Sequence, residues 1–155
     1  MRSLFVLAAI AAATLFSSCS YSSMSGNTSI APTVTGAWTL AFTPTGNSEV
    51  TTLHVNFTQN GSSLAGTVTS VSNPDTVCFG AINSQSTFTI TGQAIAQSQS
   101  NSNLNISVGF TSGSTNGTLM GTGTLTYLGT MGNGNFSFTT GSSGCTSGTF
   151  TITQG

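Results

Sequence analysis

The amino-acid sequence predicts an all-β fold, an antiparallel meander of eight to ten short strands closed into a barrel. Apolar and polar residues alternate in one run after another, and a period of two places one set of side chains on a buried face. Turn signals such as Asn-Gly separate the runs. Only 2% of the residues are charged, too few to protect open sheet edges, so a closed barrel is favoured over the alternative, a two-sheet sandwich.

The stretch Thr35–Val71 sets this pattern, with three runs joined by two turn signals. The buried residues predicted in its first two runs are Trp38, Leu40, Phe42, Leu53, Val55 and Phe57. Thr43–Gly46 has the proline and glycine spacing of a type I turn. Asn60-Gly61 predicts a tight hairpin in which both turn residues have positive φ.

The rest of the chain repeats the same pattern. Further strands are predicted in the runs Thr87–Thr91, Leu104–Phe110, Leu119–Leu128 and Thr149–Thr153, and a strand resumes over Val77–Ile82. The polar stretch Gln97–Asn103 is a predicted loop, while Asn116-Gly117 and Gly132–Gly134 are predicted turns. Beyond the first 18 residues, no run has helical spacing.

Residues 1–18 are predicted to be a secretory signal. Arg2 supplies a positive start, and Leu4–Phe16 is an apolar run too short to span a bilayer. The sequence Leu-Phe-Ser-Ser-Cys at Leu15–Cys19 resembles the lipobox of bacterial lipoproteins, with Phe16 where that motif usually has Leu. The resemblance implies cleavage before Cys19 and a lipid anchor on that cysteine. Ordinary secretion with an unmodified Cys19 is the alternative.

The signal divides the chain into three parts: the signal peptide 1–18, a lipidated cysteine with a flexible tether 19–34, and one β domain 35–155. The tether is rich in Ser, Thr, Asn and Gly. About fifteen such residues have an r.m.s. span of roughly 20 Å, enough to hold a domain just off a membrane. The expected location is the bacterial cell envelope, and Ser20 in place of Asp favours the outer membrane by the rule known for enteric lipoproteins.

Three cysteines in an exported chain leave one over after pairing. If Cys19 carries the lipid, Cys78 and Cys145 remain to form one disulfide in an oxidising compartment. Such a bond closes a loop of about 70 residues, which corresponds to roughly 4 kcal/mol on a chain-entropy estimate. A metal site is the competing interpretation, but two cysteines and His54 are fewer than the ligands it needs, so neither a metal nor another cofactor is expected.

Charge excludes one large class of partners. After the signal is removed, no Lys or Arg remains, and Glu49 and Asp75 are the remaining acidic residues. Without cations to neutralise phosphates, the chain is not expected to bind nucleic acid. Hydroxyl and amide side chains must keep it soluble instead.

No catalytic residues are predicted. His54 is the single imidazole and lies on the polar face of its run, and the chain has no G-x-S-x-G motif around a serine nucleophile. A Ser-His-acid arrangement using His54 with Glu49 or Asp75 is the basis of the alternative, a small secreted hydrolase. The two acids alone would have to form a glycosidase pair, but both lie in turn-like sequence, where acidic residues are common.

Gly36-Ala37-Trp38, at the start of a β meander, resembles the G-x-W motif of calycin barrels, the lipocalin and avidin group. The resemblance implies a barrel in which Trp38 plugs one end. In lipocalins this Trp packs under an Arg of the last strand, which the mature chain lacks, and no residue can be matched to the avidin ligand contacts. Lipobox, tether and Thr/Gly-rich strands together resemble envelope lipoproteins of soil bacteria.

These observations predict a non-catalytic, lipid-anchored envelope domain that is structural or binds a small apolar molecule or a glycan. Trp38 and Tyr127 are the aromatic residues expected to line a cavity, although core packing is the favoured role for both. A transmembrane β-barrel is a further alternative. Against it, most runs are shorter than the roughly 9–11 residues a spanning strand needs, and the outward set is Thr, Ser and Asn. The oligomeric state is left open.

Overall fold

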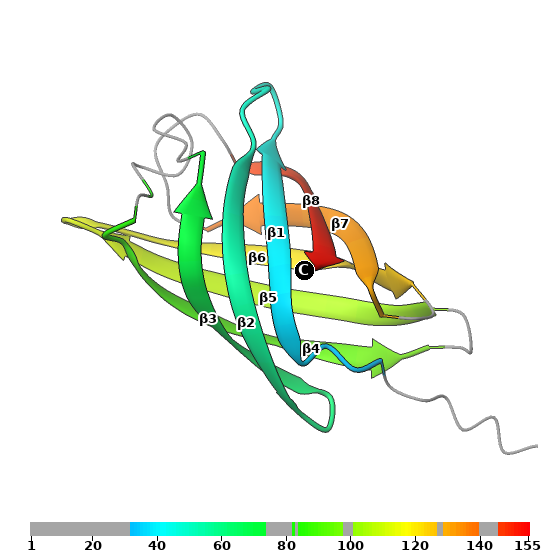
Figure 1. Cartoon of the computed structure of the whole chain (residues 1–155). Coiled ribbons are helices and arrows are strands. Elements are labelled where there is room, and N and C mark those ends of the chain that lie inside the picture. The colour runs from blue at the N-terminus through cyan, green and yellow to red at the C-terminus, as the bar shows by residue number, and fades with distance from the viewer. Residues whose placement is uncertain (1–31, 74–81, 83, 98–100, 127–128, 140–145) are drawn as a thin grey trace, which may run out of the picture.

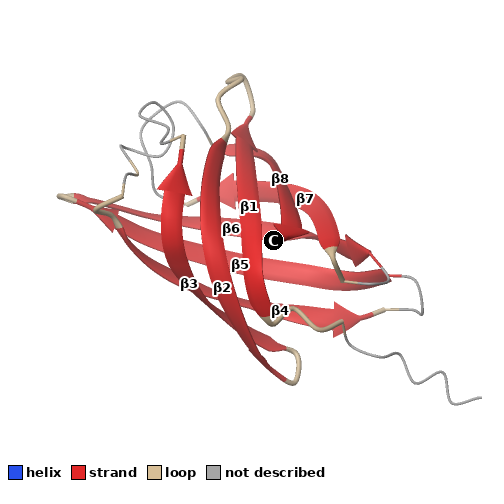
Figure 2. Cartoon of the chain, viewed as in Figure 1, coloured by secondary structure: helices blue, strands red, loops and turns tan. Residues whose placement is uncertain are grey.

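The computed structural model describes residues 32–73, 82, 84–97, 101–126, 129–139 and 146–155, and these form a closed barrel of eight antiparallel strands (Figure 1). The strands are β1 (Gly36–Pro44), β2 (Thr51–Asn60), β3 (Ser63–Ser72), β4 (Thr87–Ala96), β5 (Asn101–Ser112), β6 (Thr115–Thr126), β7 (Met131–Phe138) and β8 (Ser147–Gln154). Figure 2 shows strands and loops but no helix among the described residues. The predicted all-β meander is confirmed, with eight strands.

Each strand pairs with its neighbours in sequence, and β1 closes the barrel by pairing with β8. Leu40, for example, lies between Leu53 of β2 and Ile152 of β8. A sandwich would leave four strands as sheet edges, whereas here every strand has two partners. The fold is therefore the barrel rather than the sandwich alternative.

The barrel interior is packed with side chains. The buried apolar residues include Trp38, Leu40, Phe42, Leu53, Val55, Phe57, Ile90, Leu104, Ile106, Val108, Phe110, Leu119, Leu125, Phe136, Phe150 and Ile152. Phe42 and Phe136 meet edge to face, with ring centroids 5.6 Å apart. The predicted alternation thus places the apolar set inside, and all six residues predicted for the first two runs are buried.

Inward glycines make room for one large ring. A Cβ on Gly121 would lie 3.0 Å from Phe150, and one on Gly134 would lie 2.7 Å from the same ring and against the carbonyl oxygen of Thr122. No side chain larger than hydrogen fits there without a shift. Phe150 therefore fills the interior that β6 and β7 leave empty.

Each end of the barrel is covered by a residue outside the strands. Ile82 is 4% exposed and lines a small void beneath it together with Thr51 and Phe110. At the opposite end Val34 is fully buried, and Gln59 holds its segment through two hydrogen bonds. Pro32 and Val34, which fall within the segment predicted to be tether, are therefore held against the barrel.

Several turns lie elsewhere than predicted. Asn60 pairs with Ser63 in the ladder, so the first hairpin turns at Gly61-Ser62, and of these two only Gly61 has positive φ. This is the pattern of a type II′ turn with Gly first, not of an Asn-Gly turn. Similarly, Gly46 has φ of 84°, and the amide of Asn47 donates to the carbonyl of Pro44, so this turn is type II rather than type I.

Other predicted turns and a loop are strand. Asn116 and Gly117 lie inside β6, opposite Thr111 and Phe110, and the chain reverses instead at Gly113-Ser114. The predicted turn 132–134 lies inside β7. β5 already begins at residue 101, within the predicted loop. The asparagines face outward and the glycines of β6 and β7 face inward, so a turn-like composition satisfies the alternation of a strand. Ser102 of β5 is an exception, since this polar residue faces inward and is buried.

The strands are longer than the sequence predicts. The strands have 8 to 12 residues, so length does not argue against a membrane-spanning barrel as the sequence suggested. The outward set of Thr, Ser and Asn remains the argument against a membrane-spanning barrel. No helix in the described part of the chain is long and apolar enough to cross a membrane.

Candidate functional site

Of the two residues predicted to line a cavity, Trp38 lies in the described part of the chain and Tyr127 does not. Trp38 is 1% exposed and forms part of the core, and its indole N–H has no hydrogen-bond partner there. Tyr127 lies outside the described residues, as do Cys19, Cys78, Cys145 and Asp75. The lipid attachment at Cys19, the disulfide between Cys78 and Cys145 and any role of Asp75 therefore stay predictions.

The void that described residues enclose inside the barrel is too small for a ligand. The void at the Ile82 end has a volume of about 10 Å³ and apolar walls apart from Thr51. A volume of about 10–15 Å³ is the lower limit for a single water molecule. The hydroxyl of Thr51 is buried without a hydrogen-bond partner in the described structure.

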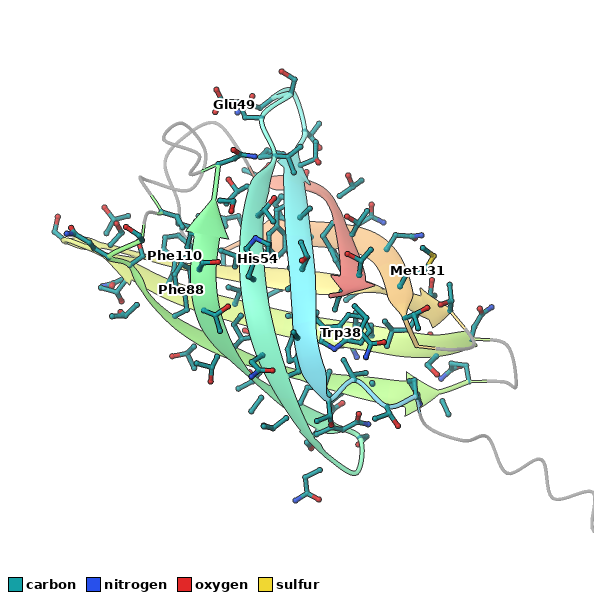
Figure 3. All side chains as sticks on the ribbon, viewed as in Figure 1. Trp38, Glu49, His54, Phe88, Phe110 and Met131 are labelled. Carbon is teal, nitrogen blue, oxygen red and sulfur yellow. The ribbon has the colours of Figure 1, made fainter. Side chains whose placement is uncertain are left out.

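His54 lies half-buried on the outer face of β2, between two hydroxyl groups (Figure 3). Its Nδ1 is 3.3 Å from Oγ1 of Thr39, and its Nε2 is 3.3 Å from Oγ of Ser72. A neutral imidazole donates from one ring nitrogen and accepts at the other, so both contacts are satisfied in either tautomer. A shallow groove of about 390 Å³ lies beside it, lined by Thr39, Asn56 and Ser70 among others.

Among the described residues, no carboxylate contacts His54 as the acid of a catalytic triad would. In serine hydrolases a carboxylate orients the histidine and stabilises its charged form. Here the hydroxyl of Thr39 occupies that position. Glu49 is exposed in the connection between β1 and β2, well away from His54 (Figure 3), and its amide donates to Asn47. No metal-binding group of three or more His, Cys, Asp or Glu residues occurs in the described part of the chain.

The most regular polar feature of the described structure lies on the outer wall of β5 to β8. We call it the Asn/Thr array; it consists of Asn103, Asn105, Thr122, Thr124, Asn133, Asn135, Thr149 and Thr151, all exposed. The strand register aligns these residues in two rows. One row joins Asn105, Thr122, Asn135 and Thr149, and the other joins Asn103, Thr124, Asn133 and Thr151. Asparagine columns on β5 and β7 thus alternate with threonine columns on β6 and β8.

The array has unused hydrogen-bonding capacity. None of its eight side chains makes a hydrogen bond to another described residue. One row continues across β4 through Gln93, which pairs with Asn105. At this edge a shallow groove of about 450 Å³ is lined by Gln93, Asn105, Ser107, Met120 and Thr122, with adjacent backbone.

The sequence contains a repeat that signals this array but does not by itself align the repeats side by side. Asn-x-Asn, Thr-x-Thr, Asn-x-Asn and Thr-x-Thr occur at 103–105, 122–124, 133–135 and 149–151. Of these residues, Asn103 falls in the predicted loop and Asn133 in the predicted turn, whereas Asn105 falls in the predicted strand Leu104–Phe110. Their alignment depends on the register of four strands, which the repeat alone does not determine.

No protein-family model matches the chain, and no curated protein matches it in sequence. Among solved structures, the chain is similar to a redesigned β-barrel, mFAP1, bound to DFHBI. The two share 14% sequence identity, the match covers 78% of this chain and 94% of the other, and the TM-score is 0.46. The assignment to the class of closed eight-stranded β-barrels rests on the strand pairing of this chain itself.

Proposed function

We propose that this chain is a lipid-anchored domain of the bacterial cell envelope that acts through the outer wall of its barrel, without catalysis. The observation that carries the proposal is the contrast between the packed interior and the uncharged, hydrogen-bonding exterior. A small apolar ligand would have to displace core side chains, because the void at the Ile82 end is no larger than a water molecule. We therefore expect any ligand or partner to bind the outer wall of the barrel.

The lipid anchor is supported by the motif at Leu15–Cys19. The structure adds a consequence for orientation. Gln59 binds both the amide of Val34 and the carbonyl of Pro32, so the chain enters the barrel at a fixed point beside the β2–β3 hairpin. A tether from Cys19 would hold this end toward the membrane. The β1–β2 connection with Glu49 would then point away from it (Figure 1).

The outward residues also favour an aqueous setting over lipid. Spanning barrels present an apolar band to the bilayer. Here the array and its neighbours are amides and hydroxyls, and the large apolar residues that are exposed, Ile95, Met120 and Met131, are few among the described strands. We therefore prefer anchoring beside the membrane to insertion in it.

We propose that the protein is not a catalyst because it has few side chains that can transfer a proton or activate a nucleophile. Acid–base catalysis needs a positioned proton carrier, and nucleophilic catalysis needs a base beside the nucleophile. His54 contacts Ser72 but has a hydroxyl instead of a carboxylate behind it. Ordinary hydrogen bonding on a sheet surface accounts for this contact.

Intact-mass measurement of the protein in membrane fractions tests the anchor. We expect a chain that begins at Cys19 and carries a lipid adduct, which Cys19→Ala abolishes. An unmodified mature chain released in soluble form would refute the anchor. For the second half of the proposal, the triple variant His54→Ala, Glu49→Ala, Asp75→Ala is expected to keep the biological role. Loss of a hydrolytic activity in this variant, with the circular dichroism unchanged, would refute a non-catalytic role.

A further inference from the structure

We infer that the Asn/Thr array is a binding surface for a neutral, hydroxyl-rich polysaccharide. This inference rests on the proposed function and deepens it, because it names the ligand class of the outer wall. Each amide of the array can donate and accept, and each hydroxyl can do both as well. Sugar hydroxyls also donate and accept, so the two sets of groups are complementary.

The absence of charge selects among polar ligands. Anionic partners such as phosphates or uronic acids are bound by Arg or Lys, and the sequence after residue 2 contains neither. Cationic partners would need acidic residues, and the array contains none; Glu49 lies outside it, on the β1–β2 connection. What remains for the array is an uncharged ligand that offers many hydrogen bonds.

The spacing of the array suits a repeating polymer. Neighbouring strands lie about 4.8 Å apart, and successive outward residues on one strand lie about 6.8 Å apart. The row of Gln93, Asn105, Thr122, Asn135 and Thr149 therefore presents a hydrogen-bonding group at intervals close to the length of one sugar ring. The groove at the β4 end of this row could accommodate part of a polysaccharide chain, with the thioether of Met120 as an apolar contact.

Repetition also explains how weak contacts would suffice. The described outer face of β5–β8 has no aromatic side chain for stacking on a sugar ring, so each sugar would be held by hydrogen bonds alone. A neutral hydrogen bond contributes little in water. Two rows of four groups would bind a polymer at several points at once, which raises its overall affinity above that of any single contact.

Co-sedimentation with insoluble matrices tests this inference. Full-length protein, in a detergent without a sugar headgroup, is mixed with cellulose, cross-linked dextran and the carboxymethylated form of each. We expect binding to at least one neutral matrix and weaker binding to its carboxymethylated form. The double variant Asn105→Ala, Asn135→Ala should bind about tenfold more weakly. The matched control Asn56→Ala, Asn60→Ala removes two exposed amides of β2 and should bind like the wild type.

Three outcomes would overturn the inference: no retention on either neutral matrix, equal binding by the two double variants, or stronger binding to the carboxymethylated matrices. A wild-type dimer that only the array variant dissociates would also overturn it, since the array would then join two copies of this chain. Thermal unfolding of both variants shows that the barrel is intact. Lipid attachment at Cys19 is scored separately, so an acylated protein that binds no glycan refutes this inference and leaves the anchor standing.

Discussion

Thr51 provides a sensitive test of how the barrel interior is packed. Its side chain is 1% exposed at the start of β2, and its hydroxyl has no partner in the described structure. It faces apolar neighbours that include Phe42, Leu53 and Ile82. Thr51→Val replaces this hydroxyl with a methyl group of nearly the same size and keeps the β-branched shape that suits a strand.

The expected effect is a gain in stability. An unsatisfied buried hydroxyl costs about 1–3 kcal/mol. Replacing it adds apolar surface to the core, and a buried methyl-sized group contributes about 0.8 kcal/mol. Imperfect fit offsets part of the sum, since core substitutions are rarely free of strain. We expect the free energy of unfolding to rise by about 1–2 kcal/mol, or the Tm by roughly 4–8 °C.

Urea denaturation and calorimetry measure the change, with Thr153→Val as the control because Thr153 is exposed on β8. The control should stay within about 0.5 kcal/mol of the wild type. Thr51→Ser keeps the hydroxyl and loses the methyl group, so it should be destabilised. If Thr51→Val instead loses more than about 1 kcal/mol while the control is unchanged, the hydroxyl is hydrogen-bonded and the reasoning is wrong.

Three further predictions concern other parts of the barrel. Gly134→Ala should lower the free energy of unfolding by at least about 2 kcal/mol because its Cβ would meet the ring of Phe150. The control Gly109→Ala, whose Cβ would have no contact closer than 3.7 Å, should be neutral or slightly stabilising. Urea unfolding curves of equal midpoint for the two variants would contradict this. Cys78 and Cys145 should resist alkylation until the disulfide is reduced, and reduction should lower the free energy of unfolding by roughly 4 kcal/mol. Two readily labelled thiols in protein purified from the envelope would rule out the disulfide. Gln59→Ala should speed hydrogen exchange at the Val34 amide by about tenfold because the acceptor of that amide is lost; an unchanged rate would mean that this hydrogen bond does not hold the segment.

The barrel was predictable because apolar and polar residues alternate consistently along its strands, and this alternation determines which side chains are buried. Trp38, Leu40 and Phe42 alternate with small or polar residues, and such a pattern has one stable arrangement, with the apolar set inside. Closure followed from the scarcity of charge. These two arguments use properties of whole strands and tolerate errors in individual turns.

The turns and the array were not predictable for a shared reason. Asn and Gly favour turns, but they also fit a strand whose inner side faces a large ring and whose outer side faces water. Gly134 faces inward, where the ring of Phe150 fills the space that a side chain would need, and Asn133 faces outward beside Thr151. Both facts depend on residues far away in sequence. A local pattern cannot reveal them, because register is decided by the assembled barrel.

The pairing of β1 with β8 has a consequence for how the protein is made. The first strand pairs with the last, so Leu40 cannot meet Ile152 until nearly the whole domain has been synthesised. Folds that join distant segments in this way form slowly, and until they close they expose a bare strand edge to other chains. Since this barrel has almost no charge with which to repel such encounters, a helper that shields the nascent chain would benefit it more than most proteins of its size.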